Sequence, residues 1–97
     1  MAATETAEGP GSPAGTIRYW AAAKAAAGTA QEPYRAGTLA EALAQARALH
    51  TGQPEFARVL GHCSFLVDGN PVGKRDHAVV ALSEGGTLEV LPPFAGG

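Results

Sequence analysis

The sequence is poor in several features that would each point to a particular kind of protein. It has one cysteine in 97 residues, so no disulfide can form within the chain and nothing favours an oxidising compartment. No apolar run approaches the roughly 20 residues of a membrane-spanning helix, and the first residues lack a basic-then-apolar signal pattern. The net charge of -2 provides no basic face for nucleic acid. We therefore expect one small cytoplasmic domain that binds neither nucleic acid nor membrane.

Residues that usually carry catalysis or bind metal are also sparse. The histidines His50, His62 and His77 lack the spacing of a metal site. The sequence shows no Ser/His/Asp or Cys/His constellation and no phosphate-binding loop. Cys63 begins an apolar strand pattern, where a free cysteine is usually a small buried hydrophobe. The chain is therefore expected to bind no metal or cofactor and not to be an enzyme by itself.

The most informative feature that is present is the carboxyl end, which reads Leu91-Pro92-Pro93-Phe94-Ala95-Gly96-Gly97. A strand pattern runs into two prolines, which hold the backbone extended, and one aromatic residue comes next. The glycines remove every β-carbon beside the last carbonyl group, so another protein and a nucleotide can approach it closely. From Phe94 onward an extended chain reaches roughly 10–14 Å. We predict that Ala95 and Gly96 thread a narrow active site and that the Gly97 carboxylate is the reacting group.

The first half of the chain predicts two strands and a short helix. Residues 1–15 show no apolar periodicity and are expected to be a flexible leader. Residues 16–20 alternate branched or aromatic with polar side chains, as a strand does. Residues 21–27 have high helix propensity, and Gly28 ends that helix. Residues 32–35 are a possible second strand, and the proline within them restricts it to an edge.

The second half predicts the main helix and the remaining strands. Thr38 and Glu41 form a capping box that opens the helix, and its apolar stripe consists of Leu39, Leu43, Ala46 and Leu49. The further elements are a helical turn from Pro54, a strand at 63–67, a hairpin turn at 68–70, a short return at 71–72 and a last strand at 87–91. Residues 78–82 are apolar and ambiguous between helix and strand.

This order of elements defines the expected fold class. Strands and helices that follow one another in this order give an α+β domain with a mixed sheet of four to five strands packed on one main helix. Such a domain is a β-grasp (ubiquitin-like) fold, in which the last strand is central and its end projects from the body. We expect a flexible leader at 1–15, the β-grasp domain at 16–93 and an extended tail at 94–97.

Three segments form a combined signature: Ile17 through Lys24 to Gly28, Phe65-Leu66-Val67-Asp68-Gly69, and Leu82 through the Pro-Pro-x-x-Gly-Gly ending. Together they resemble the small subunit of molybdopterin synthase, the MoaD branch of the MoaD/ThiS sulfur carriers. The likeness spans about residues 16–97. The chain departs from it in two places: Gly86-Thr87 stands where the family often has an acidic residue after the glycine, and residues 73–80 form a longer segment than in short members.

The resemblance implies a specific chemistry at Gly97. An E1-like, MoeB-like adenylyltransferase activates the terminal carboxylate with ATP, and a sulfur donor protein converts the acyl-adenylate to a thiocarboxylate. The loaded tail then enters a MoaE-like large subunit, in a heterotetramer, and gives its sulfur to the dithiolene of molybdopterin. This chain supplies the reacting atom and a docking surface, and its partners supply the other catalytic groups.

Six residues are candidates for contact with such a partner: Trp20, Lys24, Leu91, Pro92, Pro93 and Phe94. Leu91 and Phe94 lie where the last strand leaves the body, which favours an interface. The resemblance implies a partner-facing aromatic at Trp20, but large aromatics at strand ends mostly pack in the core, so both interpretations stay open. Lys24 is either a solvated helix charge or the partner of an acidic group on the large subunit.

Other functions also fit these residues. The same sulfur chemistry could serve thiamine, cysteine or thiolated tRNA. The chain could instead be a ubiquitin-like modifier, in which Gly97 forms isopeptide bonds with lysines. It could also be a plain β-grasp interaction domain, in which the tail is incidental. The Pro-Pro-Phe segment and the Trp20 segment favour molybdopterin synthesis among the sulfur-carrier pathways.

Overall fold

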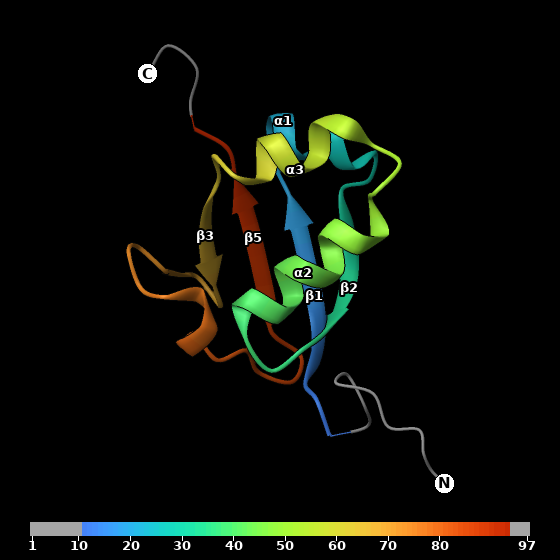
Figure 1. Cartoon of the computed structure of the whole chain (residues 1–97). Helices are drawn as coiled ribbons and strands as arrows, with labels where there is room; N and C mark the ends of the chain where they lie inside the picture. The colour runs from blue at the N-terminus through green and yellow to red at the C-terminus, as the bar shows by residue number, and fades with distance from the viewer. Residues whose placement is uncertain (1–10, 94–97) are drawn as a thin grey trace, which may run out of the picture.

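The computed structural model describes residues 11–93 and forms one mixed sheet with three helices (Figure 1). The elements in chain order are β1 (Ala14–Tyr19), α1 (Ala21–Ala27), β2 (Gln31–Arg35), α2 (Leu39–Leu49), α3 (Pro54–Leu60), β3 (Ser64–Val67), β4 (Asn70–Pro71), the 3₁₀ turn η1 (His77–Val79) and β5 (Thr87–Leu91). Within residues 11–93 no helix is long and apolar enough to cross a membrane.

The sheet has the strand order β2-β1-β5-β3-β4, which places the last strand in the centre. β5 runs parallel to β1 and antiparallel to β3, and β1 and β2 are antiparallel. β2 is an edge strand, as its proline requires, because Pro33 has no N–H to donate to a second neighbour. The prediction of a mixed β-grasp sheet with a central last strand is confirmed.

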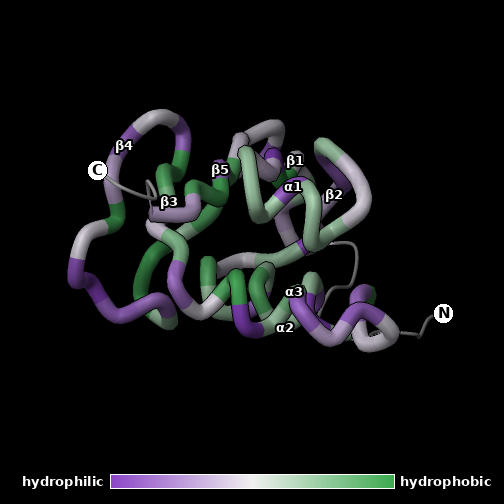
Figure 2. The backbone as a smooth tube through the Cα atoms, turned by 90° about the horizontal axis from the view of Figure 1, so that it is seen from above, coloured by the Kyte–Doolittle hydropathy of each residue, from purple (hydrophilic) through white to green (hydrophobic). Residues whose placement is uncertain are grey.

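α2 and α3 cover one face of this sheet, α1 lies at the end where β1 and β5 stop, and the face opposite α2 and α3 is the open face. In Figure 1, α2 crosses in front of the central strands, and Figure 2 shows α2 and α3 on one side of the strands. The side chains that point toward the helices are buried, among them Ile17 and Tyr19 of β1 and Leu88 and Val90 of β5. The core therefore lies between the sheet and the helices.

Local signals in the sequence account for most helix and turn boundaries. Gly28 ends α1 in the left-handed conformation, with φ 76°, which glycine adopts at no steric cost. The Thr38 side chain caps α2 by accepting a hydrogen bond from the Glu41 backbone N–H at 3.2 Å. The Glu41 carboxylate accepts from the N–H of Gly37, one residue before the position that a regular capping box uses.

Two sequence expectations need correction. β1 begins at Ala14, two residues earlier than predicted, and Gly15 pairs with Tyr34. A β-carbon at Gly15 would lie 2.5 Å from the Gly86 carbonyl oxygen. Gly15 has no side chain to contribute to the strand pattern, but for the same reason it lets these two backbone segments lie close together. Leu49 does not continue the apolar stripe of α2: its side chain is 64% exposed, because the last turn of the helix runs beyond the core.

The turn before β5 is fastened by Asp68. Its carboxylate accepts hydrogen bonds from the Thr87 backbone N–H at 2.9 Å and from the Ser83 hydroxyl at 2.8 Å. These two hydrogen bonds lower the pKa of Asp68 below its ordinary value. Asp68 therefore orders the Gly86-Thr87 segment, where the sequence departs from the pattern that the resemblance implies.

Candidate functional site

The root of the carboxyl-terminal tail is the end of the central strand. Leu91 is the last residue of β5 and pairs with Ser64 of β3. Leu91 and Pro92 are half-buried, and Pro93 is exposed. The chain thus leaves the sheet at Pro92, on the side where β5 points and where α1 lies (Figure 1). The two consecutive prolines fix φ in the extended range, so the chain leaves the body without turning back onto the sheet at these positions.

The residues predicted to react and to thread a partner's active site come after this root in the chain. Phe94, Ala95, Gly96 and the terminal Gly97 fall outside the residues that the structure describes. The predictions for these four residues therefore stay predictions. The described part of the site is the surface from which they start.

Trp20 stands on that surface beside the tail root. Its side chain is 39% exposed, so the core interpretation of this residue is wrong. Its backbone N–H donates to the Val90 carbonyl at 3.1 Å, and its indole N–H donates to the Glu89 carboxylate at 3.0 Å. The Arg18 guanidinium lies over the ring, 4.8 Å from its centroid, in a cation–π contact. An exposed tryptophan held in one orientation is suited to serve as an interface anchor.

Arg18 and Glu89 belong to the open face of the sheet. Their Cα atoms pair across β1 and β5, and Leu66 of β3 lies opposite Glu89 in the next strand. None of these three residues is buried, whereas their strand neighbours on the helical face are buried or, at Val67, half-buried. The open face therefore presents a cation, an anion and an apolar side chain in one row next to Trp20, without a helix over them.

Arg18 and Glu89 were not predicted from the sequence to lie beside Trp20, although part of the signal was available. Both alternate with buried residues along their strands, which places them on the face opposite the core. The parallel register between β1 and β5 could not be predicted from the sequence. This register makes Arg18 and Glu89 neighbours, although they are 71 positions apart in the chain. Long-range pairing of this kind is set by the whole fold.

Lys24 lies on the outer side of α1. It is exposed and forms no ion pair with a carboxylate in the part of the chain that the structure describes. It is therefore available to an acidic group of a partner, and that role remains a prediction.

Cys63 is not paired with a base that could activate its thiol, since the thiol donates to a backbone carbonyl and not to the exposed His62 before it. The Cys63 thiol is half-buried and donates to the Val59 carbonyl at 3.2 Å, and burial raises its pKa. A thiol with a raised pKa is a poor nucleophile, so the structure supports the interpretation of Cys63 as a packing residue. Among residues 11–93, no three His, Cys, Asp or Glu side chains gather in a way that could hold a metal ion.

The fold and the tail root define a class of protein: a β-grasp domain whose central strand leads into the carboxyl-terminal residues beside an open sheet face. The model of the ThiS family matches residues 17–97, which is most of the chain and includes its last glycine. The chain belongs to the ThiS family, whose members are ubiquitin-like sulfur carriers of the MoaD/ThiS type. No curated protein sequence matches the chain.

Several solved structures share this fold. The small archaeal modifier protein 1 from Methanosarcina acetivorans has a TM-score of 0.74 at 19% identity, over 89% of this chain and 98% of that one. The HVO 2177 protein from Haloferax volcanii has a TM-score of 0.70 at 27% identity, over 90% and 89%. A complex of subunits 1 and 2 of the molybdopterin-converting factor from Helicobacter pylori contains a chain with a TM-score of 0.60 at 21% identity, over 87% and 99%. These likenesses establish the β-grasp fold.

Proposed function

We propose that this protein is a sulfur carrier that acts as the small subunit of a molybdopterin synthase. The observation that carries the proposal is the match to the ThiS family through Gly97. The Pro-Pro-Phe lead-in and the exposed Trp20 at the tail root favour molybdopterin synthesis over the other pathways. The sequence has no catalytic constellation of its own, so the protein carries the sulfur atom and its partners do the chemistry.

The proposed reaction uses only the terminal carboxylate of Gly97. One carboxylate oxygen attacks the α-phosphorus of ATP on an E1-like partner, and pyrophosphate leaves. Hydrosulfide supplied by a sulfur donor then attacks the carbonyl carbon of the acyl-adenylate, and AMP leaves, so the product is a thiocarboxylate. Its sulfur forms a bond to a carbon of the dithiolene precursor in the large subunit, and water then cleaves the bond between that sulfur and the Gly97 carbonyl, which returns Gly97 to a carboxylate. The glycines at the end allow the tail to pass through the two active sites.

Docking to a MoaE-like large subunit would use the open sheet face and the tail root. Arg18, Trp20 and Glu89 form an ordered polar and aromatic row there, and Leu91 begins the extended segment. The Helicobacter pylori structure is a protein–protein complex of subunits 1 and 2, which supports a large-subunit partner for this chain as well. The tail is only about 10–14 Å long from Phe94 onward, so the body must dock close to the active site.

A second candidate is a ubiquitin-like protein modifier. Its support is the fold shared with the small archaeal modifier protein 1 from two organisms, Methanosarcina acetivorans and Haloferax volcanii. In that case the activated Gly97 carbonyl would form an amide with a lysine amine in place of a bond to sulfur. Both candidates require activation of Gly97, and they differ in the nucleophile that attacks the activated carbonyl.

The test of the proposal is reconstitution of loading. Purified chain is incubated with an E1-like adenylyltransferase, ATP and a sulfide source, and the intact mass is followed by mass spectrometry. Wild type should gain sulfur in place of oxygen, and the variant that lacks Gly97 should remain unloaded while its melting temperature is unchanged. Gly96→Val should load much more slowly, because a β-branched residue adds bulk at the tightest part of the path. Loading of the Gly97 deletion at the wild-type rate would overturn the assignment.

A further inference from the structure

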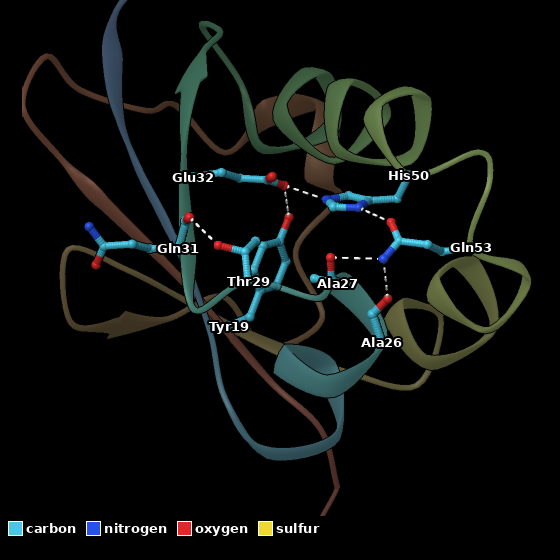
Figure 3. Close-up of polar contacts among 8 residues, drawn as sticks. All are labelled: Tyr19, Ala26, Ala27, Thr29, Gln31, Glu32, His50 and Gln53. Atoms are coloured by element: carbon cyan, nitrogen blue, oxygen red, sulfur yellow. Dashed lines mark hydrogen bonds and ion pairs between the residues drawn. The ribbon is translucent and has the colours of Figure 1, made fainter.

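The interior of the domain contains a polar network that the proposed sulfur chemistry does not use. Among residues 11–93, the buried side chains are hydrophobic except for that of His50. Its two ring nitrogens face Glu32 of β2 and Gln53 at the start of α3, and Tyr19 of β1 joins the same carboxylate (Figure 3). Tyr19 immediately precedes Trp20 in the chain, but its side chain is buried whereas that of Trp20 is exposed.

The orientation of the Gln53 amide is fixed by two backbone acceptors. Its Nε2 donates to the carbonyl oxygens of Ala26 at 3.1 Å and Ala27 at 2.9 Å, in the last turn of α1. Carbonyl oxygens accept and cannot donate, so the amide nitrogen must face them and the amide oxygen must face His50. That oxygen is an acceptor, and His50 Nδ1 must therefore carry a proton.

The second ring nitrogen also faces an acceptor. His50 Nε2 lies 2.8 Å from the Glu32 carboxylate, which already accepts from the Tyr19 hydroxyl at 2.5 Å. Burial, the hydrogen bond to Glu32 and the charge of Glu32 all raise the pKa of Tyr19, which keeps this hydroxyl a donor. Only an imidazolium, with N–H groups on both sides, satisfies Gln53 and a charged Glu32 together.

The groups around the ring leave Glu32 as its charged partner. Phe56 of α3 stacks beside the ring at 4.4 Å between centroids, Tyr19 packs edge-on, and α1 contributes only backbone carbonyls. Arg47 of α2 is exposed and touches His50 through its backbone, and Glu55 of α3 pairs with Arg58 at the surface. Burial disfavours the charged ring, but the hydrogen bonds to Gln53 and Glu32 and the Glu32 charge outweigh it, so the pKa of His50 lies above its ordinary value.

We propose that His50, Glu32, Gln53 and Tyr19 form a proton-dependent clamp that holds the ends of α1, α2 and α3 against β1 and β2. When both ring nitrogens carry a proton, the imidazolium donates to the Gln53 amide oxygen and to the Glu32 carboxylate. When a proton leaves Nε2, a lone pair faces the carboxylate; when it leaves Nδ1, a lone pair faces the Gln53 oxygen, and turning that amide would break its bonds to α1. Either loss opens one link of the clamp. This inference does not depend on the proposed function.

The direct test is an NMR titration of the wild-type chain that follows the histidine ring nitrogens. We expect His50 to keep both ring protons to a pH above the ordinary imidazole pKa of about 6.5. Glu32→Gln should lower the pKa of His50, because the charge that holds the proton is gone. A His50 pKa at or below the ordinary value in the wild type, or one that Glu32→Gln leaves unchanged, would overturn the proposal.

A second test uses thermal stability, and its sign follows from linkage. A pKa raised in the folded state gives stability that is present below the unfolded pKa and is lost as pH rises through the folded pKa. The difference in melting temperature between wild type and His50→Gln should therefore shrink as pH increases above about 6.5. His62→Gln, at an exposed histidine, should leave the pH profile of the wild type unchanged. A wild-type advantage over His50→Gln that is the same at every pH would overturn the clamp. If His50→Gln does not fold, the NMR titration decides alone.

Discussion

Tyr19 and Trp20 are consecutive residues that lie on opposite sides of the sheet, and each belongs to a polar cluster centred on a carboxylate. Tyr19 is 2% exposed and donates to Glu32 inside the domain, whereas Trp20 is 39% exposed and donates to Glu89 on the open face. The inner cluster joins strands to helices, and the outer one orders a surface beside the tail root. Similar hydrogen bonds therefore lie in the core on one side of the sheet and on an exposed surface on the other, where we propose that a partner docks.

The largest expected effect is on the inner side. Tyr19→Ala should lower the free energy of unfolding by about 3–5 kcal/mol, as truncation of a buried aromatic does. The cost combines the lost ring contacts with Phe56 and the loss of a donor to Glu32. Urea denaturation measures it, and Tyr19→Phe, which removes only the hydroxyl, should cost about 1–3 kcal/mol. A change below about 1 kcal/mol for Tyr19→Ala would contradict the burial of this residue.

At Trp20 we expect a large effect on partner binding and a small effect on stability. Trp20→Ala should weaken binding to the proposed large subunit by about 2 kcal/mol, roughly 30-fold in Kd, while the free energy of unfolding changes by less than about 1 kcal/mol. Titration calorimetry gives the affinity and urea denaturation the stability. Arg47→Ala, at an exposed position on the helical side, is the matched control and should bind like wild type. Unchanged binding by Trp20→Ala would remove this residue from the interface.

The turn at the far end of β5 offers a comparison that involves neither cluster. Asp68→Asn should cost about 1 kcal/mol of stability at neutral pH, because the Asp68 carboxylate fastens Thr87 and Ser83. A lowered pKa gives stability that is present above the unfolded pKa of about 3.9 and is lost as pH falls through the folded value. The advantage of wild type in thermal melts should therefore disappear in acid, opposite to the trend expected for His50. An advantage that persists below the folded pKa would show that charge is not its cause.

The smallest effect is expected at the exposed end of α2. Leu49→Gln should change the free energy of unfolding by no more than about 0.5 kcal/mol, because Leu49 is 64% exposed. Leu43→Ala, on the buried face of the same helix, should cost about 2–5 kcal/mol. Equal costs at the two positions in urea denaturation would restore the longer apolar stripe that the sequence suggested.

These regions also show which parts of the fold follow from local sequence. Gly28, Thr38 and the proline of β2 act through their own backbone or their nearest neighbours, so the boundaries that they set were predictable. The clamp was not, because Glu32 and His50 meet only once β2 and α2 are packed together. Leu49 was wrongly assigned to the core because helical periodicity does not tell where the opposing surface stops.

The candidate site divides in the same way. The tail and its prolines were readable because their chemistry depends on consecutive residues. Trp20 was left between two interpretations, since its position at a strand end fits either face until the fold is known. Arg18 and Glu89 needed the parallel register of β1 and β5, which no local pattern supplies.

Whether Gly97 carries sulfur is tested by the mass of the protein in its native host. The intact chain and its carboxyl-terminal peptide are purified from cells and measured by mass spectrometry. We expect a fraction in which one oxygen of Gly97 is replaced by sulfur. A free carboxylate on every molecule, or a series of covalent conjugates to lysines with no thiocarboxylate, would contradict this expectation.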